Sequence, residues 1–262
     1  MSIATEIERI QNAKSSIKTA IENKGVEVGD GLIDTYASKI DEITGGGGGG
    51  GKYAPSTISF YNATVSDLNY EVSNLDTSNM TNMNYMFYGA SKVVTLDLSH
   101  FDTSNVKEMG SMFQNNSALT TLNVGGFVTD NVTNVAYMFN GCGKLTDLDL
   151  ENFNLEKINY TSNFLYSTSN LVNLTFGYNF GKGFTQKSNN YSSYSLDLTQ
   201  TRKLSHDGLM DVINKLYDLN LTYDVANGGT LYTQRINLGS TNTAKLSADE
   251  IAIATNKGWV VS

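Results

Sequence analysis

The chain is built around a 26-residue sequence repeat, and this repeat limits the fold more than any other feature. The four copies start, in order, at Leu75, Phe101, Phe127 and Phe153, and their apolar residues recur at matching positions. One unit of this size cannot bury its own apolar face, so neighbouring units must stack and share a continuous core. The repeat therefore predicts an α/β solenoid over residues 53–177 as the fold class of the body.

Each unit is expected to contribute two walls to that core. Its Leu-x-Leu step, as at Leu96 and Leu98, has a period of two and indicates a strand with its leucines facing inward. Spacings of three and four, as at Met80, Met83 and Phe87, indicate a short helix or a tight turn on the opposite wall. The Asp-Thr-Ser-Asn motif between the two walls is expected to cap this helix and to close the turn.

The repeat motif also resembles that of a known group of proteins. Residues 101–124 read Phe-Asp-Thr-Ser-Asn-Val-x-x-Met-x-x-Met-Phe followed by the strand pattern, and they are similar to the BspA-type leucine-rich repeat of bacterial surface proteins. The segment from Lys245 to Trp259 is similar to a common ending of such arrays. Proteins of this type are adhesins, so the resemblance implies that the chain binds a host or matrix molecule and is not an enzyme.

Residues 178–262 are expected to close the end of the repeat array. A strand is predicted at residues 196–198, then a helix capped by Ser205 that extends to Leu219, and a further strand near Ile236. Ser247 and Glu250 form a capping-box pattern that opens a short helix, and Gly258 precedes a last strand. These elements are interpreted as degenerate repeats that form a C-terminal cap.

Residues 1–44 are predicted to form a separate helical head. The first helix, residues 2–24, carries a heptad seam in which Lys14 is the one polar interruption; the seam isoleucines are Ile3, Ile7, Ile10, Ile17 and Ile21. Isoleucine at both seam positions favours three or four strands in a coiled coil over two. The alternative is a helix that packs on its own neighbour, the short helix predicted over residues 31–43. Seven glycines, residues 45–51, follow as part of a flexible linker, residues 45–52.

The head has a resemblance of its own. The stretch from Ile3 to Lys14, together with residues 17–18, 21–26 and 33–36, is similar to the head of bacteriophage fibre and tail-appendage proteins. That resemblance implies that the head attaches to other virion proteins, with a variable distal domain behind a glycine-rich joint. The start of the chain is not a signal peptide, because Glu6 stands where a positive charge and a long apolar run would be needed. We therefore expect synthesis in the host cytoplasm and assembly into a virion.

Charge and composition exclude several classes of function. The formal net charge is −8, which argues against nucleic acid and anionic lipid as partners. No apolar stretch approaches the roughly 20 residues that span a bilayer. The two histidines lie in unrelated contexts, and no phosphate-loop, metalloprotease or nucleophile motif is present. We expect no cofactor and no metal, and we interpret Cys142 as a small structural residue in preference to a reactive thiol.

The outward positions of the strands form a candidate receptor-binding surface. Adjacent copies lie about 4.8 Å apart, so these positions become contiguous polar columns. The candidate residues are Thr95, Thr121 and Asp147 in one column, Asp97, Asn123 and Asp149 in the next, and Glu151 after them. Unpaired short polar groups of this kind suit sugar hydroxyls, whereas the alternative is a face that is only solvated.

Tyrosines form a second candidate surface. Tyr85 and Tyr137 share one repeat position on the wall opposite the strands, and Tyr88 and Tyr166 share another. Tyrosine suits contact surfaces because its ring is apolar and its hydroxyl polar. About half of the 15 tyrosines are expected to serve ordinary packing. The functional expectation is a homotrimeric phage fibre that binds a host surface glycan or protein. The alternatives are a bacterial surface adhesin and a capsid or tail decoration without a receptor.

Overall fold

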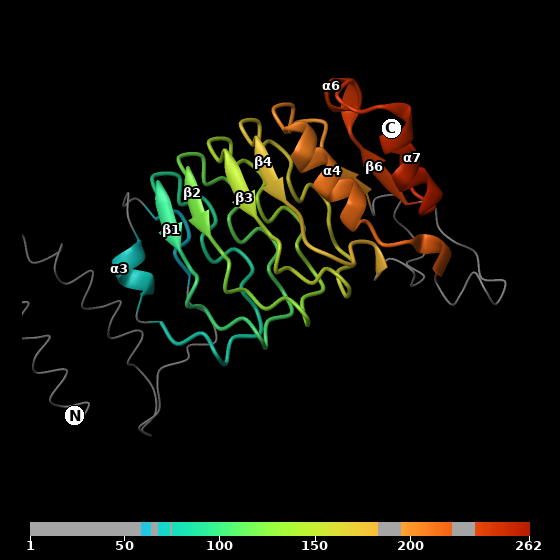
Figure 1. The fold of residues 1–262 in the computed structure, drawn as a ribbon. Coiled ribbons are helices and arrows are strands. Elements are labelled where there is room, and N and C mark those ends of the chain that lie inside the picture. Colours follow the sequence, from blue (N-terminus) through green and yellow to red (C-terminus); the bar gives the residue numbers. More distant parts are fainter. Residues whose placement is uncertain (1–58, 64–67, 74, 183–194, 222–233) are drawn as a thin grey trace, which may run out of the picture. The chain divides into compact units, whose positions relative to one another are not determined.

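The computed structural model describes residues 59–63, 68–73, 75–182, 195–221 and 234–262 (Figure 1). All of them lie in one of the two compact units into which the chain divides, Ser56–Ser262. The helical head, its isoleucine seam and the glycine linker fall outside the described residues. They therefore stay predictions.

Four short parallel strands follow one another at the 26-residue interval. They are β1 (Thr95–Asp97), β2 (Thr121–Asn123), β3 (Asp147–Asp149) and β4 (Asn173–Thr175), and Figure 1 shows them side by side in chain order. β1 pairs with β2 and β3 with β4, and each residue lies opposite its counterpart in the next copy, as Leu96 does opposite Leu122. The sequence repeat is thus a spatial repeat with the predicted strand positions.

The wall opposite the strands is made of tight turns. Single parallel bridges link the copies here too, joining Asn82, Glu108, Asn134 and Tyr160 in succession. The backbone N–H of Phe87 donates to the carbonyl of Met112 at 2.9 Å, and that of Gly89 donates to Gln114 at 2.8 Å. An α-helix would need these donors for its own bonds. Because these N–H groups donate to the next copy, this wall consists of turns. Of the two predicted alternatives, the tight turn is confirmed and the short helix is wrong.

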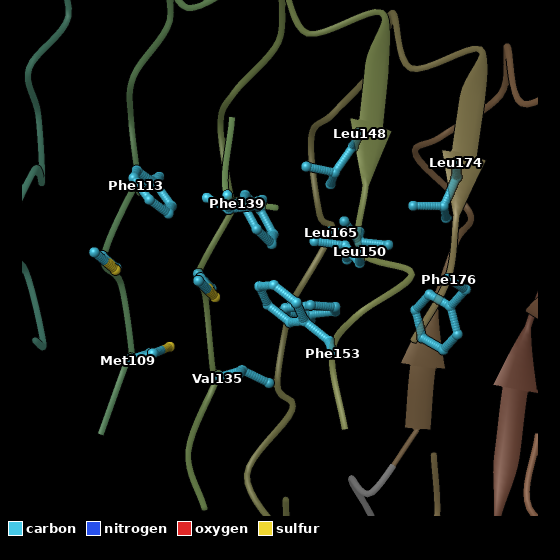
Figure 2. Packing of buried hydrophobic residues seen from close by; sticks show 14 of the residues in the cluster. Met109, Phe113, Val135, Phe139, Leu148, Leu150, Phe153, Leu165, Leu174 and Phe176 are labelled. Carbon is cyan, nitrogen blue, oxygen red and sulfur yellow. The ribbon is translucent and has the colours of Figure 1, made fainter. Parts of the chain in front are cut away.

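A row of aromatic rings fills the space between the two walls. Phe87 stacks on Phe113 and Phe113 on Phe139, with ring centroids 5.7 Å and 5.6 Å apart, and Phe139 meets Phe164 edge to face at 5.4 Å. Figure 2 shows Phe113 and Phe139 on neighbouring turns of chain, with Leu148 and Leu174 reaching inward from β3 and β4. These side chains are at most 3% exposed, so the core is continuous from copy to copy.

A partial unit and a short helix precede the first strand. The backbone N–H of Phe60 donates to the carbonyl of Met86 at 2.6 Å, and the Phe60 ring stacks on Phe87. Helix α3 (Asn69–Val72) follows, and the Asn69 side chain accepts a 2.7 Å hydrogen bond from the backbone N–H of Asp97 on β1. Asn69 thereby satisfies a strand donor that has no preceding strand beside it in the described residues.

The C-terminal part forms a separate three-stranded parallel sheet with helices. Strands β5 (Ser195–Asp197), β6 (Arg235–Asn237) and β7 (Val260–Val261) pair in that order, which confirms the three predicted strand positions. Among the described residues, the helical segments that accompany them are α4 (His206–Lys215), η2 (Leu219–Leu221), α6 (Gly239–Thr243) and α7 (Ala248–Asn256). The predicted capping box of α7 is confirmed, since Ser247 and Glu250 make both of its hydrogen bonds.

The helix that Ser205 caps is shorter than predicted. α4 spans His206–Lys215, and Ser205 accepts from the backbone N–H of Gly208 as expected. Leu216 is extended, and Leu219 lies in η2, so the prediction of a helix through Leu219 was wrong. The Lys257 ammonium donates to the carbonyls of Asn214 at 2.6 Å and Leu216 at 3.0 Å, which gives these acceptors a partner outside the helix.

Candidate binding surfaces

The structure brings the predicted strand-face residues together in two exposed columns. Thr95 lies opposite Thr121 and Asp97 opposite Asn123 on the β1–β2 pair, and all four side chains are exposed. Asp147 and Asp149 on β3 are exposed as well, beside Asn173 and Thr175 of β4. Glu151 is exposed just beyond β3. The placement of these residues is as predicted, whereas their binding role stays a prediction.

The second of these columns closes the turns that follow the strands. The carboxylate of Asp97 accepts the backbone N–H of Ser99 at 3.0 Å, and that of Asp149 accepts Glu151 at 3.0 Å. The amide oxygen of Asn123 accepts from Gly125 in the same way at 3.1 Å. For Asp97, the hydrogen bond from the backbone N–H of Ser99 is the main reason that the pKa of its carboxyl is lowered. The prediction that these polar groups are unpaired was wrong, because short Asx side chains bond the backbone two residues onward.

In the first column, Asp147 is hydrogen-bonded to the next copy. The Asn173 amide donates to the Asp147 carboxylate at 2.5 Å, and the Thr146 hydroxyl donates to its other oxygen at 2.5 Å. These two hydrogen bonds, the one from Asn173 first, lower the pKa of Asp147. At neutral pH the face is therefore acidic, and much of its hydrogen-bonding capacity is used within the protein.

The Asp-Thr-Ser-Asn motif joins the copies to one another. The Asp102 carboxylate accepts the backbone N–H of Ser104 at 3.0 Å and closes the turn, as predicted. The Thr103 hydroxyl, however, donates to Val128 in the following copy, and the Asn105 amide donates to Ser78 in the preceding one. No helix follows for the motif to cap. The signal for this role was present in the sequence, since threonine and asparagine persist at these positions where aspartate is lost, as at Thr129 and Asn131.

The turn layer carries exposed tyrosines on its outer side. We call the following set the tyrosine wall: Tyr61, Tyr85, Tyr88, Tyr137, Tyr160 and Tyr166. Tyr88 is half-buried, and the other five are 37% to 59% exposed. The intervening residues of the same turns, such as Met86 and Phe87, point into the core and are at most 1% exposed. The sequence prediction placed four of these tyrosines on this wall, named Tyr85 and Tyr137 among them as binding residues, and missed Tyr61 and Tyr160.

Two tyrosines of this layer have a left-handed backbone. Tyr85 has φ 61° and Tyr137 has φ 59°, and the same repeat position is Ser111 at 58° and Asn163 at 52°. A bulky residue is uncommon in this region, where asparagine is tolerated better. Tyrosine at this position therefore has a conformational cost. Packing in the core does not offset that cost, because both rings are exposed.

The remaining reactive groups have structural surroundings. Cys142 is fully buried, its thiol donates to the Phe113 carbonyl at 3.1 Å, and burial raises its pKa to about 12. One ring nitrogen of His100 lies 2.9 Å from the carbonyl oxygen of Val72, and His206 pairs with Glu250. Within the described ranges, no group of three or more His, Cys, Asp or Glu side chains is placed to hold a metal ion. The helices found there are all too short or too polar to cross a membrane.

Comparison with known protein families gives a match over part of the chain. Residues 57–180 match the family described as "Mycoplasma protein of unknown function, DUF285". This range contains the strands β1 to β4 and the tyrosine wall, and the match is compatible with BspA-type repeats. No curated protein and no solved structure matches the chain.

Proposed function

We propose that the chain is a binding protein without catalytic activity, whose body is a leucine-rich-repeat solenoid of the BspA type. One observation carries the proposal: outward positions 26 residues apart lie in register, as Thr95 and Thr121 do, over one continuous core. A stack of this kind holds rows of side chains at fixed spacing, which suits an extended ligand. The match of residues 57–180 is compatible with such repeats.

We further propose that the protein is a phage fibre or appendage that attaches the virion to a host cell. The support comes from the sequence of residues 1–44, which is similar to phage fibre heads, and from the seven glycines behind it. In this proposal the head joins other virion proteins and forms a homotrimer through its isoleucine seam. Three linked bodies would offset weak single contacts through avidity.

A bacterial surface adhesin is the second candidate. It is favoured by the description of the matching family, which refers to Mycoplasma proteins and not to phages. The two proposals share the binding body and differ in what holds residues 1–44. A third outcome is a decoration protein that is part of the virion and binds no cell.

Two measurements on the full chain separate these proposals. Labelled protein is titrated onto cells of the bacterial strain that carries the source genome or supports the phage, and saturable binding is expected. An antibody against the chain is then applied to purified virions and to cell envelopes. Antibody binding to virions supports the phage fibre. Antibody binding to cell envelopes but not to virions supports the adhesin. Labelled virions together with no saturable cell binding would leave decoration as the function.

A further inference from the structure

We propose that the tyrosine wall is the ligand-binding surface of the body and that its ligand is a neutral, extended glycan. This inference rests on the binding function proposed above and names its site and its ligand class. It moves the site from the strand face to the opposite layer of the repeat stack.

Exposed aromatic surface in the described residues is concentrated in this layer. Among all described residues, the exposed large apolar or aromatic side chains are six tyrosines and three valines. Five of these tyrosines belong to the tyrosine wall. The sixth, Tyr178, pairs with Asn154 at another corner of the unit. No phenylalanine, leucine or methionine is among them, so the wall combines aromatic rings with a polar surround.

The rings at the N-terminal side of the wall are held before any ligand arrives. The Tyr61 and Tyr88 rings stack with centroids 4.9 Å apart and 9° between their planes. The Asn115 amide donates to the Tyr88 hydroxyl at 3.1 Å, and the Tyr85 ring lies 5.7 Å from that of Tyr88. A pre-ordered aromatic platform binds with a smaller entropic cost than a mobile one.

A second group of rings lies farther along the same layer. Tyr137 is two copies beyond Tyr85 at the same repeat position, and its backbone N–H donates to Ser162 of the copy that carries Tyr160 and Tyr166. At ~4.8 Å for each parallel copy, Tyr85 and Tyr137 are ~10 Å apart along the stack, about the length of a disaccharide. Ser111 and Gln114 stand at the tyrosine positions of the copy between them. Two aromatic platforms are therefore separated by one polar step.

The chemistry of this layer favours a neutral sugar chain over other ligands. A tyrosine ring offers an apolar face to sugar C–H groups, and its hydroxyl and the nearby amides offer hydrogen bonds to sugar hydroxyls. The net charge of −8 disfavours a polyanion.

The strand face is less suited to the same ligand. Asp97, Asn123 and Asp149 close turns with their side-chain oxygens, and Asp147 is bonded by Asn173 and Thr146. A ligand would have to replace these internal hydrogen bonds in order to gain its own. In the tyrosine wall the rings are exposed without such a replacement.

The repeat itself supplies variants that remove the rings and keep the fold. Asn163 occupies the position of Tyr85 and Tyr137 with the same left-handed backbone, so Tyr85→Asn and Tyr137→Asn introduce a residue that the turn already accepts. The matched control on the strand face is the Asp147→Asn and Asp149→Asn pair, because Asn173 and Asn123 stand in the same columns. Circular dichroism melts establish that each full-length variant is folded.

The probes are neutral hexasaccharides of glucose, galactose, mannose and N-acetylglucosamine, immobilised on an array. Sialylated and phosphorylated oligosaccharides on the same array test charged ligands. We expect the full chain to bind at least one neutral series. The Tyr85→Asn/Tyr137→Asn variant should lose about tenfold or more in affinity, as for the loss of central aromatic contacts. The aspartate variants should bind as the unchanged protein does.

Cell binding separates failure of this inference from failure of the proposed function. Saturable cell binding that periodate oxidation of the cells abolishes, and that the tyrosine variant lacks, supports the inference. Saturable cell binding that resists periodate, or that only the aspartate variants lose, overturns the inference and leaves the binding function standing. Binding restricted to the charged oligosaccharides overturns the ligand class. Absence of any cell binding refutes both proposals.

Discussion

The Thr103 hydroxyl makes two hydrogen bonds to the backbone of Val128 in the next copy of the repeat. It donates to the Val128 carbonyl at 2.9 Å and accepts the Val128 N–H at 2.7 Å. One side chain thus replaces a rung of backbone pairing between the copies. Thr77 and Thr129 occupy the equivalent position and donate to the next copy at 3.0 Å and 2.9 Å.

Thr103→Val is expected to destabilise the stack. The substitution keeps the shape of a side chain that is 0% exposed but leaves the Val128 N–H and carbonyl without this partner. Both hydrogen bonds are part-buried, and their loss is expected to cost about 1–3 kcal/mol. Urea unfolding followed by circular dichroism measures the change. Thr103→Ser, which keeps the hydroxyl, should lose less, and equal losses would show that the hydrogen bonds are not the cause.

Thr161→Val is expected to have the opposite effect. Thr161 is 1% exposed, its hydroxyl has no hydrogen-bond partner among the described residues, and Val135 occupies the same position one copy earlier. Replacing this hydroxyl by a methyl group removes an unsatisfied buried polar group and should stabilise the protein by about 1 kcal/mol.

The control for Thr161→Val is Thr168→Val. The Thr168 hydroxyl is equally buried but donates to the Leu165 carbonyl at 2.7 Å. Urea unfolding should therefore show a loss of stability for Thr168→Val and a gain for Thr161→Val. A loss of stability in both variants would contradict the assignment of an unsatisfied hydroxyl.

The two walls of the repeat differ in how far the sequence predicted their structure. The strand positions and the inward leucines follow from periodicity alone, as Leu96 and Leu148 illustrate. The choice between a helix and a turn on the other wall could not be made, because spacings of three and four fit both. It depends on where the backbone N–H of Phe87 donates, which is a contact between copies. Periodicity within one copy carries no information on such contacts.

The candidate surfaces were predicted to a similar extent. Alternation placed Asp97 and Asp149 outward correctly, but it could not show that their oxygens close local turns. Tyr85 and Tyr137 were found because they share a repeat position, and so were Tyr88 and Tyr166. Tyr61 was missed because it precedes the first full copy, and only the ring stack with Tyr88 reveals its place.

Cys142 should be unreactive in the folded protein. Burial raises its pKa to about 12, so the thiolate, which is the reactive form, is scarce at neutral pH. We expect Ellman's reagent to modify the thiol of the full chain only as fast as the protein unfolds. The rate should rise with urea in step with the loss of circular dichroism. Rapid modification in native buffer would show that the thiol is accessible.

The pair of His206 and Glu250 should respond to pH. The His206 Nε2 and a carboxylate oxygen of Glu250 are 2.8 Å apart, and the hydrogen bond that the ring donates to Glu250 is the main reason that the pKa of His206 is raised above 6.5. A raised folded-state pKa means that the contribution to stability is present below the unfolded pKa and is lost as the pH rises through the folded pKa. The pKa of Glu250 is lowered, first by the backbone of Ser247, so its contribution is lost as the pH falls through that value.

NMR titration of the His206 ring tests this coupling. Glu250→Gln removes the charge and can still accept the capping hydrogen bond, so the pKa of His206 should fall toward its ordinary value while α7 stays formed. Asp249→Asn removes the adjacent exposed carboxylate of the same helix and should leave the His206 titration nearly unchanged. If both variants shift it equally, the effect is general electrostatics and not the hydrogen bond.

Lys257→Met is expected to destabilise the C-terminal part of the body. The Lys257 ammonium donates to the carbonyls of Asn214 at 2.6 Å and Leu216 at 3.0 Å, where α4 ends, and methionine keeps the apolar stem without the donors. Hydrogen bonds that involve a charged group are worth about 1.5–3 kcal/mol. Lys215→Met is the control, because its ion pair with Asp211 at 3.2 Å lies within one helix and such pairs contribute about 0.5 kcal/mol or less. Hydrogen exchange at the α4 amides should rise in the first variant and stay nearly unchanged in the second, whereas equal protection in both would contradict a capping role for Lys257.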